Sequence, residues 1–181
     1  PAGVLAHDPE DAFDALVALL GDREAAIRQS AIAALNSIGH PDMPARTLVL
    51  LDDADPHVRV SALKIAGYFG YPECMTRVIE CCRDADEQVR RAAAEQLPFF
   101  DDPRAAEPVP ALLDDPVAAV RAAAVSICAR MNHGSRVTAL IDRLRDRDAW
   151  VRFVTVKTLA TLGDTTALAP ICCFTAEEIW S

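Results

Sequence analysis

Apolar and polar positions along the chain repeat with a period of 31 residues, and each period holds two amphipathic segments separated by a short polar turn. In the first period, one segment places apolar side chains at helical spacing, namely Phe13, Leu16, Val17 and Leu20. The second segment of each period carries a small residue at one fixed position, at Ala31, Ala62, Ala93, Ala124 and Thr155. Small residues in register allow neighbouring helices to approach closely. The pattern therefore predicts five consecutive pairs of helices.

Residues that tolerate a left-handed backbone mark the ends of the predicted repeats, at Gly39, Gly70, Asp101, Asn132 and Gly163. They divide the chain into repeats at about 11–39, 40–70, 71–101, 102–132 and 133–163, followed by a partial sixth repeat at 164–181. The second helix of the first repeat is expected to begin near Glu24 and to bury Ile27, Ala31, Leu35 and Ile38. Pro98 falls inside a second helix, so it is expected to kink or shorten that helix near Phe99 and Phe100.

Helix pairs of this kind are expected to stack, because one pair cannot bury both of its faces alone. The predicted fold class is an all-α, right-handed α-α superhelix, an α-solenoid that forms a single domain over residues 1–181. The partial sixth repeat supplies a first helix without a second one. Its sequence from Leu168 to Trp180 is apolar, so this helix is expected to pack on another surface or to mediate dimerisation.

An aspartate and an arginine six residues later recur in every repeat. The aspartates are Asp22, Asp53, Asp84, Asp115 and Asp146, and the arginines are Arg28, Arg59, Arg90, Arg121 and Arg152. Each aspartate is expected to lie in the turn between the two helices and to cap the second helix. Each arginine is then within reach of that aspartate or of the one in the next repeat. The pattern favours a structural ladder over the alternative of an arginine track for phosphate groups.

The repeats resemble HEAT repeats, and in particular the short variety called PBS-lyase HEAT-like repeats. The resemblance is closest in the fourth repeat, where residues 101–124 read DDPRAAEPVPALLDDPVAAVRAAA. It extends from residue 11 to about residue 174 and implies that the aspartate–arginine pairs join one repeat to the next. Members of this family act as scaffolds, adaptors, bilin lyases, lyase-like chaperones and parts of some enzymes, so the resemblance predicts the fold more closely than the function.

Composition narrows the classes of partner. The net charge is −9. This charge disfavours a nucleic-acid partner, because protein surfaces that bind nucleic acids are strongly basic. No apolar run approaches the roughly 18 residues of a membrane span, so no membrane partner is expected. Six cysteines form neither a CxxC pair nor a spacing with histidine that suits a metal. The sequence therefore predicts reduced thiols, a cytoplasmic location, and neither a metal site nor a cofactor.

Catalytic motifs are not apparent in the sequence. It contains no glycine-rich phosphate loop, and no His-Glu dipeptide of the kind that metal-dependent hydroxylases on similar repeats carry. We therefore predict no catalytic residues and favour a protein that is not an enzyme. Two alternatives remain open: a subunit resembling the phycobilin lyases that handles a tetrapyrrole, and a HEAT-like DNA glycosylase, for which Glu95 near Phe99 is the candidate acid.

The outward positions of the second helices form the candidate binding site. These positions lie one, five and nine residues after each repeated arginine and are expected to line the concave face of the solenoid. Four cations, one acid and three aromatic side chains occur there: Lys64, Tyr68, Arg91, Glu95, Phe99, Arg130, Phe153 and Lys157. A mixed surface of this kind predicts a bound protein or peptide. The alternative is that the cations keep the face solvated while Phe99 and Phe153 tuck between repeats.

Overall fold

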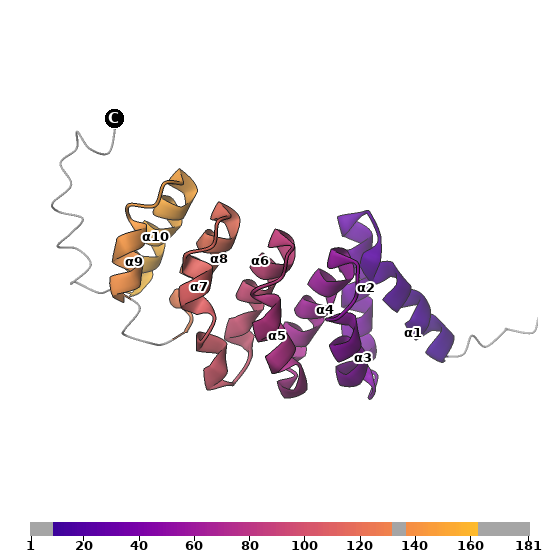
Figure 1. The fold of residues 1–181 in the computed structure, drawn as a ribbon. Helices are drawn as coiled ribbons and strands as arrows, with labels where there is room; N and C mark the ends of the chain where they lie inside the picture. Colours follow the sequence, from indigo (N-terminus) through magenta and orange to yellow (C-terminus); the bar gives the residue numbers. More distant parts are fainter. Residues whose placement is uncertain (1–8, 132–136, 163–181) are drawn as a thin grey trace, which may run out of the picture. The chain divides into compact units, whose positions relative to one another are not determined.

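A computed structural model describes residues 9–131 and 137–162, and every regular element within these ranges is helical (Figure 1). The first helices of the pairs are α1 (Pro9–Ala18), α3 (Met43–Leu50), α5 (Met75–Cys81), α7 (Val109–Leu113) and α9 (Val137–Arg143). The second helices are α2 (Ala25–Ile38), α4 (Pro56–Phe69), α6 (Glu87–Gln96), α8 (Ala118–Cys128) and α10 (Ala149–Leu162). Short 3-10 turns occur at η1 (Leu19–Gly21), η2 (Pro72–Cys74), η3 (Leu97–Phe99) and η4 (Pro103–Ala106). The prediction of an all-α fold with five helix pairs is confirmed.

The helices form two compact units, an N-terminal unit of residues 1–102 with α1 to α6 and a C-terminal unit of residues 103–181 with α7 to α10. Within each unit the second helices contact one another, α4 with α2 and α6, and α8 with α10. That the whole chain is one repeat domain stays a prediction. The partial sixth repeat and its expected packing or dimerisation fall in 163–181, outside the described residues.

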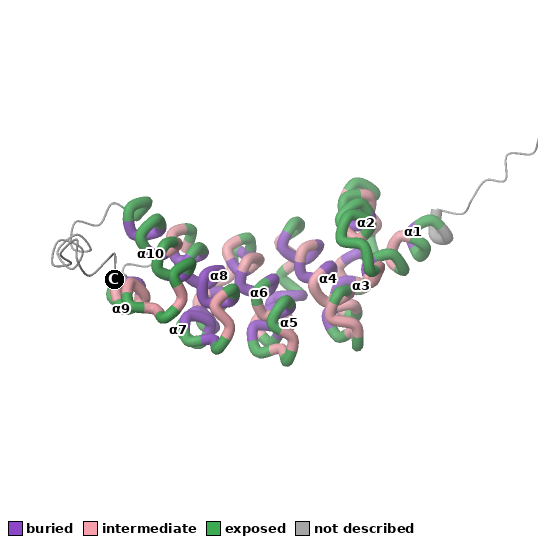
Figure 2. Tube along the Cα trace, turned by 90° about the horizontal axis from the view of Figure 1, so that it is seen from above, coloured by how far each residue is buried: buried purple, intermediate pink, exposed green. Residues whose placement is uncertain are grey.

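Small residues allow the second helices to pack closely, as their register predicts. All five small positions are buried, with at most 2% of the residue exposed, at Ala31, Ala62, Ala93, Ala124 and Thr155. Buried segments run along α4, α6 and α8 in Figure 2. In the N-terminal unit α4 also buries Gly67, where an added Cβ would overlap the side chain of Gln96 on α6. The α4–α6 contact therefore depends on the absence of a side chain at this position.

At the start of α4, α6 and α10, two acidic residues two positions apart build the helix entry, rather than the repeated aspartate alone. The repeated aspartate accepts the backbone N–H two residues on, as Asp53 does from Asp55 at 2.8 Å. Asp55 is itself the N-cap of α4 and accepts the N–H of His57 at 2.8 Å. The expectation that the repeated aspartate caps the helix was therefore wrong by two residues, because the aspartate closes the turn that leads into the cap.

Two predicted glycine caps are confirmed, and one predicted helix end is different. Gly39 and Gly70 end α2 and α4 with φ of 60° and 64°, a conformation that favours glycine. Asp101 does not adopt this conformation, since no residue other than glycine has a positive φ within the described ranges. Pro98 explains the difference: α6 ends at Gln96 and continues as the 3-10 turn η3, so the predicted shortening is confirmed.

Two apolar side chains expected in the core of α2 are exposed instead. Ile27 is 40% exposed and Ile38 is 50% exposed, whereas Ala31 and Leu35 are buried as predicted. The counterpart of Ile27 is fully buried in α6 at Val89. The difference arises because no helix pair precedes α1 and α2 within the described residues, so one side of α2 lacks the neighbour that the other second helices have.

Candidate functional site

The eight predicted residues on the outward positions of the second helices, here called the second-helix stripe, are not buried. Lys64 and Tyr68 lie on α4, Arg91 and Glu95 on α6, Phe99 on η3, Arg130 just after α8, and Phe153 and Lys157 on α10. The three aromatic rings are well exposed, at 68% for Tyr68, 46% for Phe99 and 51% for Phe153. The alternative that Phe99 and Phe153 tuck between repeats was therefore wrong.

In the N-terminal unit, contacts within the protein partly neutralise the stripe. Arg91 donates from Nε to a carboxylate oxygen of Glu95 at 2.8 Å, one helical turn away. Lys64 reaches only the amide oxygen of Gln29, at 3.5 Å. Glu95 is thus already ion-paired, which removes support for its role as a glycosylase acid.

Aromatic rings gather at the C-terminal end of α4. Tyr68 meets Phe69 edge to face, with 4.9 Å between ring centroids, and Phe69 stacks on Tyr71 at 5.0 Å. The backbone carbonyl of Phe99 also comes close to Gly70, 3.1 Å from where a Cβ would lie. Phe69 was absent from the predicted site because it falls one residue beyond the outward register.

In the C-terminal unit, α10 carries an aromatic pair that sequence reasoning found only in part. Trp150 stacks on Phe153 with 5.2 Å between ring centroids and an interplanar angle of 28°. The Lys157 ammonium lies 5.6 Å from the centroid of the Phe153 ring. Trp150 was missed because it precedes the repeated arginine, although its position three residues before Phe153 places both on one side of a helix.

Two of the repeated arginines, Arg59 and Arg121, bridge two turns rather than pairing within one. In the N-terminal unit Arg59 donates from Nε and Nη2 to both carboxylate oxygens of Asp84, at 2.9 and 2.8 Å. Its Nη1 donates to the backbone carbonyl of Asp53 at 2.7 Å. The partner carboxylate therefore belongs to the next repeat, while the arginine's own repeat supplies only backbone carbonyls, those of Asp53 and Ala54.

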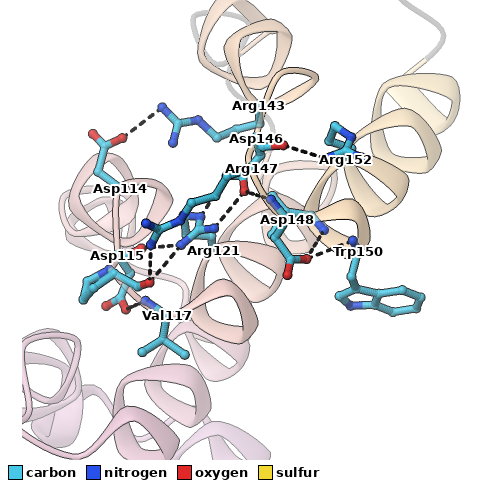
Figure 3. Close-up of polar contacts among 12 residues, drawn as sticks. Asp114, Asp115, Val117, Arg121, Arg143, Asp146, Arg147, Asp148, Trp150 and Arg152 are labelled. Carbon is cyan, nitrogen blue, oxygen red and sulfur yellow. Dashed lines mark hydrogen bonds and ion pairs between the residues drawn. The ribbon is translucent and has the colours of Figure 1, made fainter. Parts of the chain in front are cut away.

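The same bridge is buried in the C-terminal unit (Figure 3). Arg121 donates to both carboxylate oxygens of Asp146, at 2.8 and 2.7 Å, and to the carbonyl of Asp115 at 2.8 Å. Only 5% of the Arg121 side chain and 4% of the Asp146 side chain are exposed. The hydrogen bond to Asp146 raises the pKa of Arg121, and the same bond lowers the pKa of Asp146 below its ordinary value. A guanidinium enclosed in this way supports a structural role rather than phosphate binding.

The arginines at the two ends of the described repeats lack such a partner. Arg28 donates to the backbone carbonyls of Asp22 and Arg23, at 2.6 and 3.1 Å. Arg152 donates to the carbonyl of Asp146 at 2.8 Å. Neither forms an ion pair with a carboxylate among the described residues.

The lowered pKa of Asp146 predicts acid sensitivity in the C-terminal unit. A carboxyl group whose folded pKa is depressed stabilises the fold above its unfolded pKa of about 3.9, and this contribution is lost as the pH falls through the folded value. We expect the free energy of unfolding of the parent protein to decline below about pH 4. The free energy of unfolding of the Asp146→Asn variant should decline less steeply. Urea titrations followed by circular dichroism at a series of pH values measure this. Asp142→Asn, at an exposed position, should keep the parent slope, and equal slopes in all three proteins would contradict the prediction.

Burial keeps three of the described thiols protonated. Burial is the main cause that raises the pKa of Cys74 and Cys81 to about 11 and that of Cys82 to about 12. These side chains therefore behave as small apolar groups at neutral pH. Cys172 and Cys173 lie outside the described residues.

Neither a metal-binding cluster nor a membrane-spanning helix occurs in the part of the chain that the structure describes. No group of three or more His, Cys, Asp or Glu side chains is placed to hold a metal ion there. None of the described helices combines the length and apolarity needed to cross a membrane.

Comparison with known proteins finds one family. A family model described as HEAT repeats matches residues 43–118 and 107–177. No curated protein matches the chain. The two matched segments together cover α3 to α10 and extend beyond the last described residue.

Proposed function

The chain belongs to the HEAT-repeat family, and from that premise we propose that it is a non-catalytic scaffold or adaptor that binds a protein or peptide on the face lined by its second helices. HEAT repeats generally serve as protein-interaction scaffolds. The period of 31 residues supports the finer assignment to the short PBS-lyase HEAT-like repeats. No disulfide joins the described cysteines, which supports a reducing location such as the cytoplasm.

One observation carries this proposal: in each of the two units, exposed aromatic rings and cations lie at the outward positions of the second helices, on a chain whose net charge is −9. Surface aromatic residues and arginines are enriched among the residues that dominate binding energy in protein interfaces. The described residues offer no comparable support for the tetrapyrrole or glycosylase alternatives, since the described thiols are buried and Glu95 is paired with Arg91.

A charge-reversal experiment tests the stripe. Peptides are selected against the whole chain from a random library displayed on phage, and the best are titrated as synthetic peptides. Replacing Arg91, Arg130 and Lys157 by Glu should weaken binding by about tenfold or more, because their charges and stems lie in the proposed contact.

The matched control reverses three exposed arginines away from the stripe, Arg23, Arg83 and Arg145. This control variant has the same net charge as the stripe variant. A loss of peptide binding that is common to both variants is therefore an effect of the overall charge alone. A binder that survives the stripe variant and is lost in the control would overturn the proposed face. Circular dichroism of both variants shows whether each keeps its helices.

A further inference from the structure

The α10 helix exposes large apolar side chains on the side opposite its core. Trp150 is 61% exposed, Phe153 51% and Val156 46%, while Val151 and Leu159 of the same helix are buried. A helix that is apolar on both sides is usually covered on both. Clustered apolar side chains on a protein surface also mark binding sites more often than scattered ones do.

The aromatic part of this surface is already assembled in the free chain. Trp150 and Phe153 stack on each other at 5.2 Å, and Lys157 holds its ammonium 5.6 Å from the centre of the Phe153 ring. Side chains braced in this way lose little conformational freedom when a partner docks on them. The Asp148 carboxylate is turned to the backbone, since it accepts the N–H groups of Trp150 and Val151 at 2.9 and 3.1 Å.

The charge on this helix points to the sign of the partner. Residues 149–162 contain Arg152 and Lys157 and no acidic residue. Neither cation forms an ion pair with a carboxylate within the described ranges, in contrast to Arg91 on α6, which pairs with Glu95. A positive helix on a chain of net charge −9 attracts acidic groups and selects against basic ones.

From this geometry we infer that Trp150, Phe153 and Lys157 form a docking site for an acidic peptide segment of a partner protein, one that carries a bulky apolar side chain. The apolar side chain packs on the Trp150–Phe153 pair, and a carboxylate of the segment meets Lys157. Seven residues of helix separate Trp150 from Lys157, or about 10 Å at 1.5 Å per residue. An extended peptide covers that distance in about three residues, which sets the spacing between its apolar and acidic groups. This inference rests on the proposed function and names the chemistry of its partner.

Trp150 itself reports the binding. Trp180→Phe leaves Trp150 as the sole tryptophan of the whole chain. Three synthetic ten-residue probes are titrated: one with Leu and Phe among four Glu residues at the spacing above, one with the Glu replaced by Lys, and one with the Leu and Phe replaced by Ser. The first probe should shift the emission of Trp150 to shorter wavelength and saturate, with affinity that falls as salt is raised. The other two probes should bind at least about tenfold more weakly than the first.

Variants of the site test its aromatic pair and its positive charge separately. Lys157→Glu should reverse the preference between the Glu and Lys probes, and Phe153→Ser should weaken the Glu probe by about tenfold or more. Arg83→Glu, at an exposed position of the N-terminal unit away from the stripe, should leave the order of the three probes unchanged. Reversal by Lys157→Glu also tests the charge without removing the aromatic pair, so it stays informative if Phe153→Ser alters the helix.

Several results would overturn the inference. They are equal affinity for all three probes, no saturable change of Trp150 emission up to about 1 mM probe, or a blue shift that depends on protein concentration alone. The last result would assign the surface to a second copy of the chain, and sedimentation measures it directly. If binding of the peptides selected from the random library still depends on the stripe while the Glu probe does not bind, the proposed function is supported and only the acidic partner is contradicted.

Discussion

Replacing Arg121 by Met is expected to lower the free energy of unfolding of the C-terminal unit by about 3–5 kcal/mol. Arg121 is the most enclosed of the bridging arginines with a described partner, and its guanidinium meets both oxygens of Asp146 and the carbonyl of Asp115. The substitution removes the ion-pair partner of the Asp146 carboxylate, which is 4% exposed in the intact protein and keeps only the N–H of Asp148 and the charge of Arg143. A buried charge that loses its partner costs more than the pair contributes when intact. Urea unfolding followed by tryptophan emission and circular dichroism measures the loss.

The control is the same substitution at Arg152, which is exposed and donates only to a carbonyl. Arg152→Met should cost less than about 1 kcal/mol. Asp146→Asn combined with Arg121→Met should cost less than the sum of the two single changes, by about 1–3 kcal/mol, since the asparagine carries no charge and keeps an acceptor for the turn. An Arg121 variant no less stable than the Arg152 variant would show that the bridge is not what joins these repeats.

The helix pairs could be predicted from the sequence because every signal for them is local and repeated. The small residue at Ala62, the aspartate at Asp53 and the glycine at Gly70 recur in register, and each acts within its own turn or helix. Periodicity could not predict with which carboxylate Arg59 would form its ion pair. Asp53, six residues earlier, and Asp84, 25 residues later, were both within reach, and only the packing of α4 on α6 brings Asp84 to the guanidinium.

The errors in burial occur where the period stops applying. Ile27 has the register of a core residue, yet it is 40% exposed because the repeat that would cover it is absent from the described residues. Pro98 replaces a left-handed helix end by a 3-10 turn, so Asp101 loses the role that its register assigns to it. Trp150 lies outside the register used to predict the binding face, and its stacking on Phe153 depends on side-chain rotamers that a repeat pattern does not encode.

The first repeat of the N-terminal unit depends on one aromatic ring. Phe13 on α1 is 1% exposed and packs in a cluster with Leu20, Leu35 and Ile65. The His40 ring lies 4.9 Å from its centroid, and the Arg46 guanidinium lies over its face at 4.9 Å. One side chain thus connects the first two helix pairs through apolar contacts and a cation–π contact.

Phe13→Ala is therefore expected to destabilise this repeat by about 3–5 kcal/mol, through lost burial and the cavity that remains. Neighbouring repeats interact mainly with each other, so the effect should be local. Hydrogen exchange read by mass spectrometry should accelerate in α1 and α2 while α6, in the same unit, keeps most of its protection. The matched control is Phe153→Ala, which removes a ring that is 51% exposed and should cost less than about 1 kcal/mol. Uniform acceleration across α1 to α6 would mean that the unit unfolds as one cooperative block, and unchanged exchange in α1 would mean that Phe13 does not hold the first repeat in place.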